Sequence, residues 1–223
     1  MSFKDTFTKA RLVGFTQPSE EFLEFFDDAK GLIVYCSRVS NPSNQLNTAT
    51  ADKLIKYLIK NKHWSPFEMA SATIEVETTR DIARQLLRHR SFAFQEFSQR
   101  YADPTKDLGF VLREARLQDS KNRQNSIEVD DEELQKQWNS VQQSLIDSAQ
   151  NAYTWAIQQG IAKEQARCVL PEGNTLSRLY VQGTIRSFIH YLEVRTDPST
   201  QKEHRVLALE VAKAIYSIYI VKE

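Results

Sequence analysis

Two hydrophobic periodicities divide this chain. Apolar residues recur every three to four positions, the spacing of an amphipathic helix, over residues 49–62, 80–90, 130–159, 185–195 and 201–221. A further short helix is expected to end at Pro171. Residues 69–79 instead alternate and are rich in Thr, Ile and Val, and residues 176–181 are also typical of a strand. The pattern predicts an α+β fold, in which several helices pack on a small, mainly antiparallel sheet.

The chain has no internal repeat and no linker, so we expect residues 1–223 to form a single domain. Its 41% hydrophobic and 26% charged residues are sufficient for a packed core. Residues 104–128 are polar and lack a period, which predicts a long loop. The acidic residues at 130–133 suit the positive N-terminal end of the helix that follows, and Gly160 is expected to end that helix.

Composition excludes several classes of protein. Basic and acidic residues each total 29, which excludes a uniformly basic nucleic-acid-binding surface. Two cysteines, Cys36 and Cys168, are too few for a disulfide framework, and the apolar run around Cys168 predicts a buried structural thiol. The four histidines include no HExxH pair, so no metal site is expected.

Targeting signals are also missing from the sequence. No stretch approaches the ~20 apolar residues of a membrane span, and the N-terminus has no apolar leader. We therefore expect a cytoplasmic protein that makes no contact with membranes.

The segment from Arg80 to Tyr101 is the most unusual part of the chain. It contains five arginines against two carboxylates, a net charge of +3 in a chain of zero formal charge. Arg80, Arg84 and Arg88 are four residues apart and would repel one another on one helical stripe. A solvated basic face is one interpretation. The other is a site for a nucleotide or single-stranded nucleic acid, because arginine suits phosphate and four interleaved aromatic rings can stack on a base.

Arg88-His89-Arg90 is followed, after seven residues, by Ser98. This spacing resembles the RHR-x7-S signature of the flavin-dependent thymidylate synthases, and the resemblance continues through Glu96, Arg100 and Tyr101. Three further blocks are similar to the family in the same order, at residues 63–68, 166–171 and 183–195. The match extends over most of the chain, from the helix at 49 to the last helix.

The resemblance implies reductive methylation of deoxyuridine monophosphate (dUMP) to thymidine monophosphate (dTMP). Methylenetetrahydrofolate would donate the carbon, FAD would carry the hydride, and NADPH would reduce the flavin. The family forms homotetramers whose active sites are built where subunits meet. Because the six glycines form no GxGxxG loop, arginines and a helix end would meet the phosphates of FAD.

The resemblance also implies site residues. On the flavin it places Ser65, Arg88, His89, Arg90, Glu96, Thr184, Ile185, Arg186 and His190. On the nucleotide it places Gln85, Arg88, Glu96, Phe97, Ser98, Gln99, Arg100, Arg167 and Arg195. Arg195 would be the catalytic residue, because a fixed cation beside the pyrimidine stabilises negative charge that develops on the uracil. Ser98 has no histidine near it in sequence, so we interpret it as a hydroxyl that binds the nucleotide and not as a nucleophile.

The chain departs from the family at three positions. Many members have asparagine where this chain has Gln95, and some have asparagine in the late block where it has Thr184 and His190. Residues 104–128 match no family motif. The hypothesis from another class is an RNA- or single-strand-binding protein that uses segment 80–101. That hypothesis predicts salt-dependent oligonucleotide binding, whereas the enzyme hypothesis predicts a yellow protein.

Overall fold

The computed structural model describes the backbone of residues 7–219 and the side chains of residues 7–216. Its centre is a four-stranded sheet in the order β1 (Lys9–Phe15), β2 (Ser71–Thr79), β6 (Leu176–Thr184) and β3 (Ala93–Glu96). Each neighbouring pair of these strands is antiparallel. A separate two-stranded sheet pairs β4 (Arg116–Gln118) with β5 (Ser126–Glu128).

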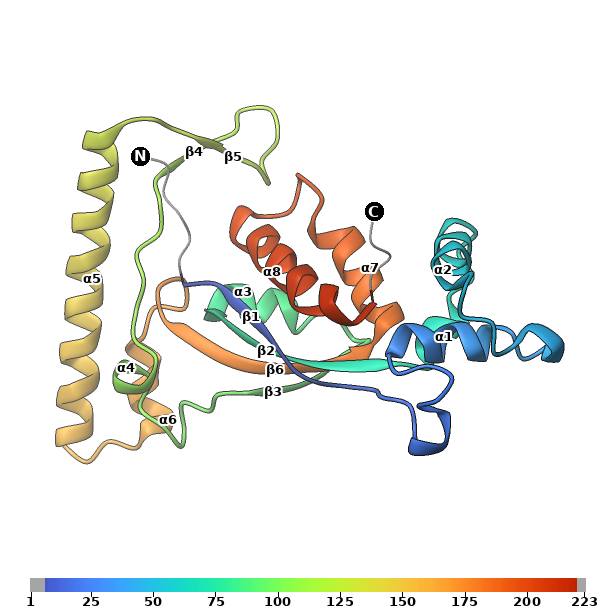
Figure 1. Ribbon diagram of the computed structural model, residues 1–223. Helices are drawn as coiled ribbons and strands as arrows, with labels where there is room; N and C mark the ends of the chain where they lie inside the picture. Colours follow the sequence, from blue (N-terminus) through green and yellow to red (C-terminus); the bar gives the residue numbers. More distant parts are fainter. Residues whose placement is uncertain (1–6, 220–223) are drawn as a thin grey trace.

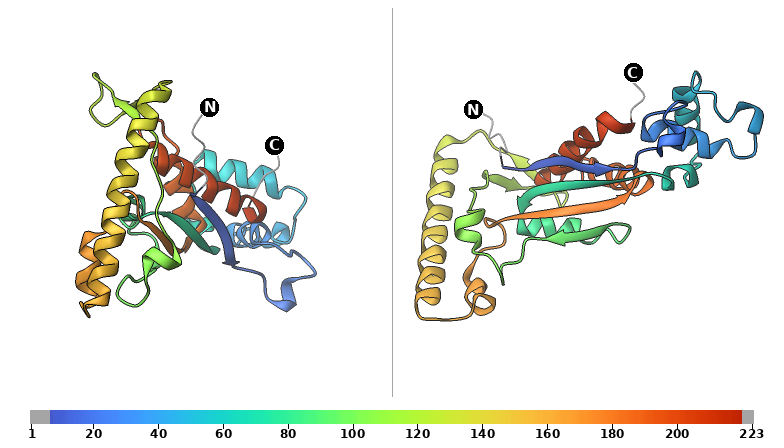
Figure 2. Two further views of the ribbon diagram at one scale, coloured as in Figure 1. Left: turned by 90° about the vertical axis from the view of Figure 1, so that its left-hand side faces the viewer. Right: turned by 60° about the horizontal axis from the view of Figure 1, so that its bottom comes forward.

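Helices surround the four-stranded sheet unevenly. The α-helices of the described residues are α1 (Ala29–Ser37), α2 (Ala51–Lys60), α3 (Arg80–Leu86), α4 (Pro104–Asp107), α5 (Glu132–Gln158), α6 (Lys163–Ala166), α7 (Ile185–Arg195) and α8 (Lys202–Tyr219). Figures 1 and 2 show α3, α7 and α8 together on one face of the sheet, α1 and α2 at one end, and α5 at the other. The predicted α+β fold is confirmed. Within the described part of the chain, no helix is both long and apolar enough to span a bilayer.

The observed elements differ from the predicted ones where segments are short. The loop predicted over residues 104–128 contains α4 and strands β4 and β5, so that prediction is wrong. β4 and β5 have three residues each, too few to show a period. Three elements were not predicted: β1, α1 and β3. β3 has only four residues, and α1 has too few polar residues to show an amphipathic period. The helix predicted over residues 80–90 ends at Leu86, and the strand predicted over 176–181 extends to Thr184.

The two central strands separate the core from an outer polar face. Their inward side chains are buried: Ala72, Ile74 and Val76 on β2, and Leu179 and Val181 on β6. Alternate residues on the other face are polar, and they form cross-strand ion pairs such as Arg178 with Glu77. The core therefore lies between this sheet and the helices α3, α7 and α8.

Both central strands continue directly into a helix. β2 leads into α3 at Arg80, and β6 leads into α7 after Thr184. The side chain of Thr184 caps α7, because its hydroxyl oxygen accepts a hydrogen bond from the amide of Ser187. Because the strands are antiparallel, the two helices begin at opposite ends of the same face. The end of α7 consequently reaches the segment after α3, where Arg195 contacts His89.

Gly183 brings β6 against the segment that follows α3. A Cβ at this position would lie 2.4 Å from Cδ1 of Phe92, whose ring is buried. Phe92 follows the Arg88-His89-Arg90 sequence closely, so its packing on Gly183 helps to fix the position of those three side chains.

We expect Gly183→Ala to lower the melting temperature, because overpacking a filled core costs ~1–3 kcal/mol. Gly14→Ala is the matched control, since it adds the same methyl group to an edge strand where no atom lies within 4 Å. Thermal unfolding followed by circular dichroism compares the two. Equal melting temperatures for both variants would contradict the packing described for Phe92.

Candidate active site

The arginine stripe predicted for Arg80, Arg84 and Arg88 does not form. α3 ends at Leu86, so Arg88 lies beyond the helix. Arg80 is 8% exposed, and its Nη1 lies 3.4 Å from Oε1 of Glu96, whereas Arg84 is exposed. The expected repulsion is reduced because the first arginine is buried against a carboxylate and the third leaves the helix, although the charge of Arg84 still contributes to lowering the pKa of Arg80, after burial as the main cause.

The exposed arginines of this segment differ in whether a carboxylate neutralises them. Two are ion-paired: Arg84 with Glu172 at 3.1 Å and Arg100 with Glu164 at 3.2 Å. Arg88 and Arg90 are exposed and form no ion pair among the described residues. Part of the basic charge on which the nucleic-acid hypothesis relies is therefore neutralised, and the unneutralised charge of this segment lies on either side of His89.

Arg195 and His89 form the polar centre of the site. Nε of Arg195 lies 2.9 Å from Nε2 of His89. Since arginine can only donate, His89 accepts and must be neutral, with its proton on Nδ1. Burial lowers the pKa of His89, and the charges of Arg195 and Arg88 lower it further. The hydrogen bond thus fixes a cation that no carboxylate of the described residues neutralises.

Two buried rings form the wall behind His89. The ring of Tyr191 lies 5.0 Å from that of His89, and the ring of His204 lies 6.4 Å away. Burial raises the pKa of Tyr191. Burial lowers the pKa of His204 to about 3, and the charges of Arg195 and His89 act in the same direction. Of these four side chains, only Arg195 is therefore charged at neutral pH.

Gln85 joins this cluster through two hydrogen bonds. Its Nε2 donates to Oε1 of Gln201 at 2.8 Å, and its Oε1 lies 3.2 Å from Nδ1 of His204. The structure thus brings together Gln85, His89 and Arg195, three of the site residues that the resemblance implied. It adds Gln201 and His204, which sequence reasoning missed. Neither belongs to a family motif. The one feature in the sequence that could have indicated a role is the histidine at position 204, because it falls within the predicted last helix.

The predicted nucleotide loop forms a second group near α6. Phe97 donates its amide to the carbonyl of Arg178 at 2.8 Å, and Ser98 Oγ lies 3.4 Å from the amide of Arg100. Among the described residues, no histidine or other general base is hydrogen-bonded to Ser98 Oγ. Gln99 is 4% exposed, and its Nε2 has no partner among the described atoms.

Contacts with α6 and the turn after it hold this loop. Lys163 Nζ donates to the carbonyl of Tyr101 at 2.7 Å, and Arg100 pairs with Glu164. Arg167, half-buried on the following 3-10 turn (Arg167–Val169), completes the group. Cys168 is exposed on the same turn, so the prediction of a buried thiol is wrong; the chain turns at the surface there.

The residues predicted to bind flavin lie in three places. His89 belongs to the polar centre, and Arg88 and Arg90 flank it in sequence, while Glu96 lies on β3 and accepts from Ser177 Oγ at 2.8 Å. The others lie around the start of α7: Ser65 is exposed, Thr184 caps the helix, Arg186 pairs with Glu68, and the ring of His190 lies 4.8 Å from that of Trp64. Ile185 is 3% exposed and its amide donates to the carbonyl of Ala70.

Known proteins resemble this chain over most of its length. Residues 21–219 match the family described as thymidylate synthase complementing protein. The chain is 46% identical over 211 residues to a probable flavin-dependent thymidylate synthase of Paramecium bursaria Chlorella virus 1, covering 95% of this chain and 93% of the relative. It is 50% identical over 184 residues to a flavin-dependent thymidylate synthase of Synechocystis sp., covering 82% and 83%.

A solved structure is also similar. The crystal structure of the UMP/dUMP methylase PolB from Streptomyces cacaoi, bound with 5-Br dUMP, matches with a TM-score of 0.78 and 26% identity. The match covers 95% of this chain and 91% of that one.

The low pKa of His204 predicts acid sensitivity. Between its ordinary value near 6.5 and about 3, the unfolded chain binds a proton at this histidine and the folded chain does not, so stability falls as pH falls. The loss is at most about 1.4 kcal/mol per pH unit for one histidine. We expect the melting temperature of the parent to fall relative to that of His204→Leu between pH 6.5 and 4.5. If the melting temperatures of the parent and of His204→Leu change equally with pH, the low pKa of His204 is contradicted.

Proposed function

The chain belongs to the family of flavin-dependent thymidylate synthases, and we propose that it catalyses the reductive methylation of dUMP to dTMP. Methylenetetrahydrofolate donates the carbon, and NADPH is the reductant. The observation that carries the proposal is the hydrogen bond between Arg195 and a neutral His89, beside Gln85. It supports an anion-stabilising site in which the cation has a fixed position.

The hydrogen-bond donors of this site suit the diphosphate of FAD. Arg88 and Arg90 offer guanidinium groups that no described carboxylate neutralises, as a diphosphate requires. The start of α7 supplies a helix N-terminus near Ser65, Arg186 and His190. When bound, FAD carries the hydride from NADPH. The residues proposed to hold it are Ser65, Arg88, His89, Arg90, Glu96, Thr184, Ile185, Arg186 and His190. Ile185 is buried and its amide donates to Ala70, so its part is to fix the start of α7.

Arg195 acts on the pyrimidine by charge. Negative charge develops on the uracil ring as the ring is activated for attack on the methylene carbon, and a cation already in place stabilises it without reorganising. Neutral His89 holds Arg195 at Nε, so both terminal nitrogens of Arg195 remain for the ring. A carboxylate in place of His89 would offset the charge, and a protonated histidine would repel it.

The remaining nucleotide residues bind and orient the substrate. They are Gln85, Arg88, Glu96, Phe97, Ser98, Gln99, Arg100 and Arg167. No side-chain hydrogen bond among the described residues joins the group around Ser98 to the group around Arg195. This separation supports active sites that are shared between subunits of a homotetramer.

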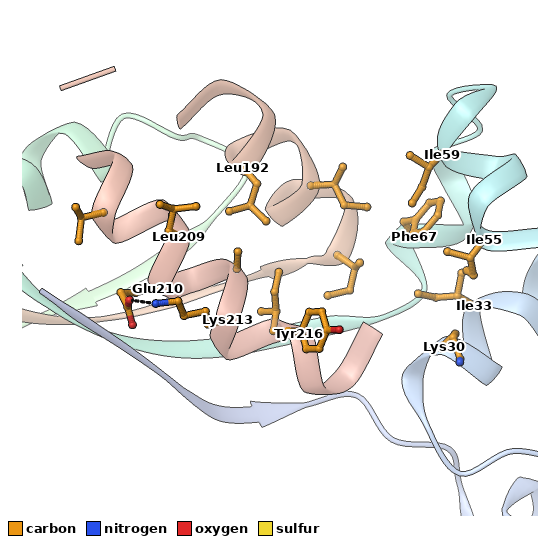
Figure 3. A pocket seen from close by; sticks show the side chains of 15 residues that line it. Lys30, Ile33, Ile55, Ile59, Phe67, Leu192, Leu209, Glu210, Lys213 and Tyr216 are labelled. Atoms are coloured by element: carbon orange, nitrogen blue, oxygen red, sulfur yellow. Dashed lines mark hydrogen bonds and ion pairs between the residues drawn. The ribbon is translucent and has the colours of Figure 1, made fainter. Parts of the chain in front are cut away.

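Exposed apolar surface also supports the homotetramer. Trp138, Val141, Leu145 and Trp155 on α5 are between 40% and 60% exposed, while Tyr153 and Ala156 of the same helix pack on their own chain. Figure 1 shows α5 at the edge of the molecule. A groove of about 850 Å³ lies between α1, α2, α7 and α8, and Figure 3 shows its apolar lining, with Ile33, Ile55 and Leu209 among the labelled residues.

We expect the purified protein to be yellow and to form dTMP. Arg195→Ala should retain flavin and oxidise NADPH but form dTMP at least about tenfold more slowly, since a charged hydrogen bond contributes ~1.5–3 kcal/mol. Ser98→Ala should remain active. Single-turnover formation of dTMP from reduced enzyme measures both. An inactive Ser98→Ala variant with intact flavin, beside a near-normal Arg195→Ala, would reverse the two roles.

Leu145→Glu should dissociate the tetramer, because it places a charge in the proposed α5 contact. Gln150→Glu adds the same charge at an exposed polar position of the same helix and should leave the assembly intact. Light scattering gives the mass of each. A parent protein that is monomeric with full flavin would contradict shared active sites, and a tetrameric Leu145→Glu would exclude this face as the contact.

A further inference from the structure

We propose that Glu203 and His204, at the start of α8, are positioning residues that fix the orientation of the Gln85 amide and so select uracil over cytosine nucleotides. The inference rests on the proposed function, in which Gln85 binds the nucleotide. Neither residue belongs to the set that the resemblance implied. Both act through Gln85, at the ends of one chain of hydrogen bonds.

Glu203 is the fixed end of that chain. It is 6% exposed, and its Oε1 accepts from Arg116 Nη2 at 2.6 Å while its Oε2 lies 3.4 Å from Arg113 Nη1. Burial opposes ionisation, but the hydrogen bond from Arg116 and the charges of both arginines outweigh it and lower the pKa of Glu203. The carboxylate is therefore ionised and can only accept hydrogen bonds.

The carboxylate of Glu203 sets the orientation of the Gln201 amide, which in turn sets that of the Gln85 amide. Gln201 donates from Nε2 to Oε2 of Glu203 at 2.9 Å, which leaves its oxygen to face Gln85. Gln85 then donates from Nε2 to that oxygen at 2.8 Å, so its own oxygen faces His204. A glutamine amide is nearly symmetric in shape, so only these partners distinguish its two ends.

His204 closes the chain at the other end. Its Nδ1 lies 3.2 Å from Oε1 of Gln85, and the ring is fully buried and neutral. A neutral histidine has one proton, and the acceptor at Gln85 places it on Nδ1. Nε2 of His204 has no partner among the described atoms. Reversing Gln85 would set two acceptors against each other at Gln201, and at His204 it would require the ring proton to move from Nδ1 to the buried Nε2, which has no acceptor among the described atoms.

The fixed amide has a consequence for base recognition. Gln85 keeps one N–H and one lone pair outside the chain, beside the cluster that contains Arg195. Uracil presents a donor at N3 and acceptors at its carbonyl oxygens, whereas cytosine presents an acceptor at N3 and a donor at N4. A free glutamine could turn over to pair with either base. A glutamine with one fixed direction pairs with one of them.

The test compares dUMP and dCMP binding to the flavin-loaded enzyme by calorimetry. His204→Leu removes the donor, and Gln201→Leu interrupts the chain from the other side while leaving the ion pairs of Glu203 in place. Each should reduce the preference for dUMP over dCMP about fivefold or more, the effect of one neutral hydrogen bond of ~1 kcal/mol. His204→Asn keeps an N–H donor at the δ position and should recover most of the preference.

Flavin content and melting temperature at pH 7.5 should stay near the parent values in all three variants. An unchanged preference in Gln201→Leu and in folded His204→Leu would overturn the proposal, as would equal losses in His204→Leu and His204→Asn. If His204→Leu does not fold, Gln201→Leu decides. A parent enzyme that forms no dTMP from dUMP would instead contradict the proposed function, so the two failures are distinguishable.

Discussion

The pairing of β2 with β6 is the constraint on which the rest of the structure depends. Every residue from Ser71 to Thr79 pairs with one from Leu176 to Thr184, and each strand passes into a helix without a loop. The direction and starting point of α3 and α7 are thereby set by the sheet. The contact between Arg195 and His89 follows, although 106 positions separate the two residues in sequence. A shift in this register would move the two halves of the polar centre apart.

Around that centre, burial determines which groups are charged. Three rings, those of His89, Tyr191 and His204, are kept neutral by desolvation, and this leaves Arg195 as the cation of the cluster. The segment 104–128, to which sequence assigned no role, contributes to the same arrangement. Arg113 pairs with Asp81 in the first turn of α3 and with Glu203 in the first turn of α8, so it ties together two helices that carry site residues.

Sequence patterns predicted the long elements and the motif-bearing residues. The amphipathic period of α5 and the alternation of β2 were readable because each extends over many residues. β1 and β3 were missed because both are edge strands in which no residue is fully buried, and β3 has only four residues. Cys168 was misplaced because an apolar run does not reveal that the chain turns at the surface. Gln201 and His204 could not be found, since their importance arises from contact with Gln85, which lies 116 or more positions away.

The central claim is that this site transfers a carbon to dUMP. Its most direct test uses methylenetetrahydrofolate labelled with carbon-13 at the methylene group, reduced flavin-loaded enzyme and dUMP, with the product observed by nuclear magnetic resonance. The account predicts that the label is found in the methyl group of dTMP in proportion to the flavin oxidised. Oxidation of the flavin while the label stays on the folate would contradict it.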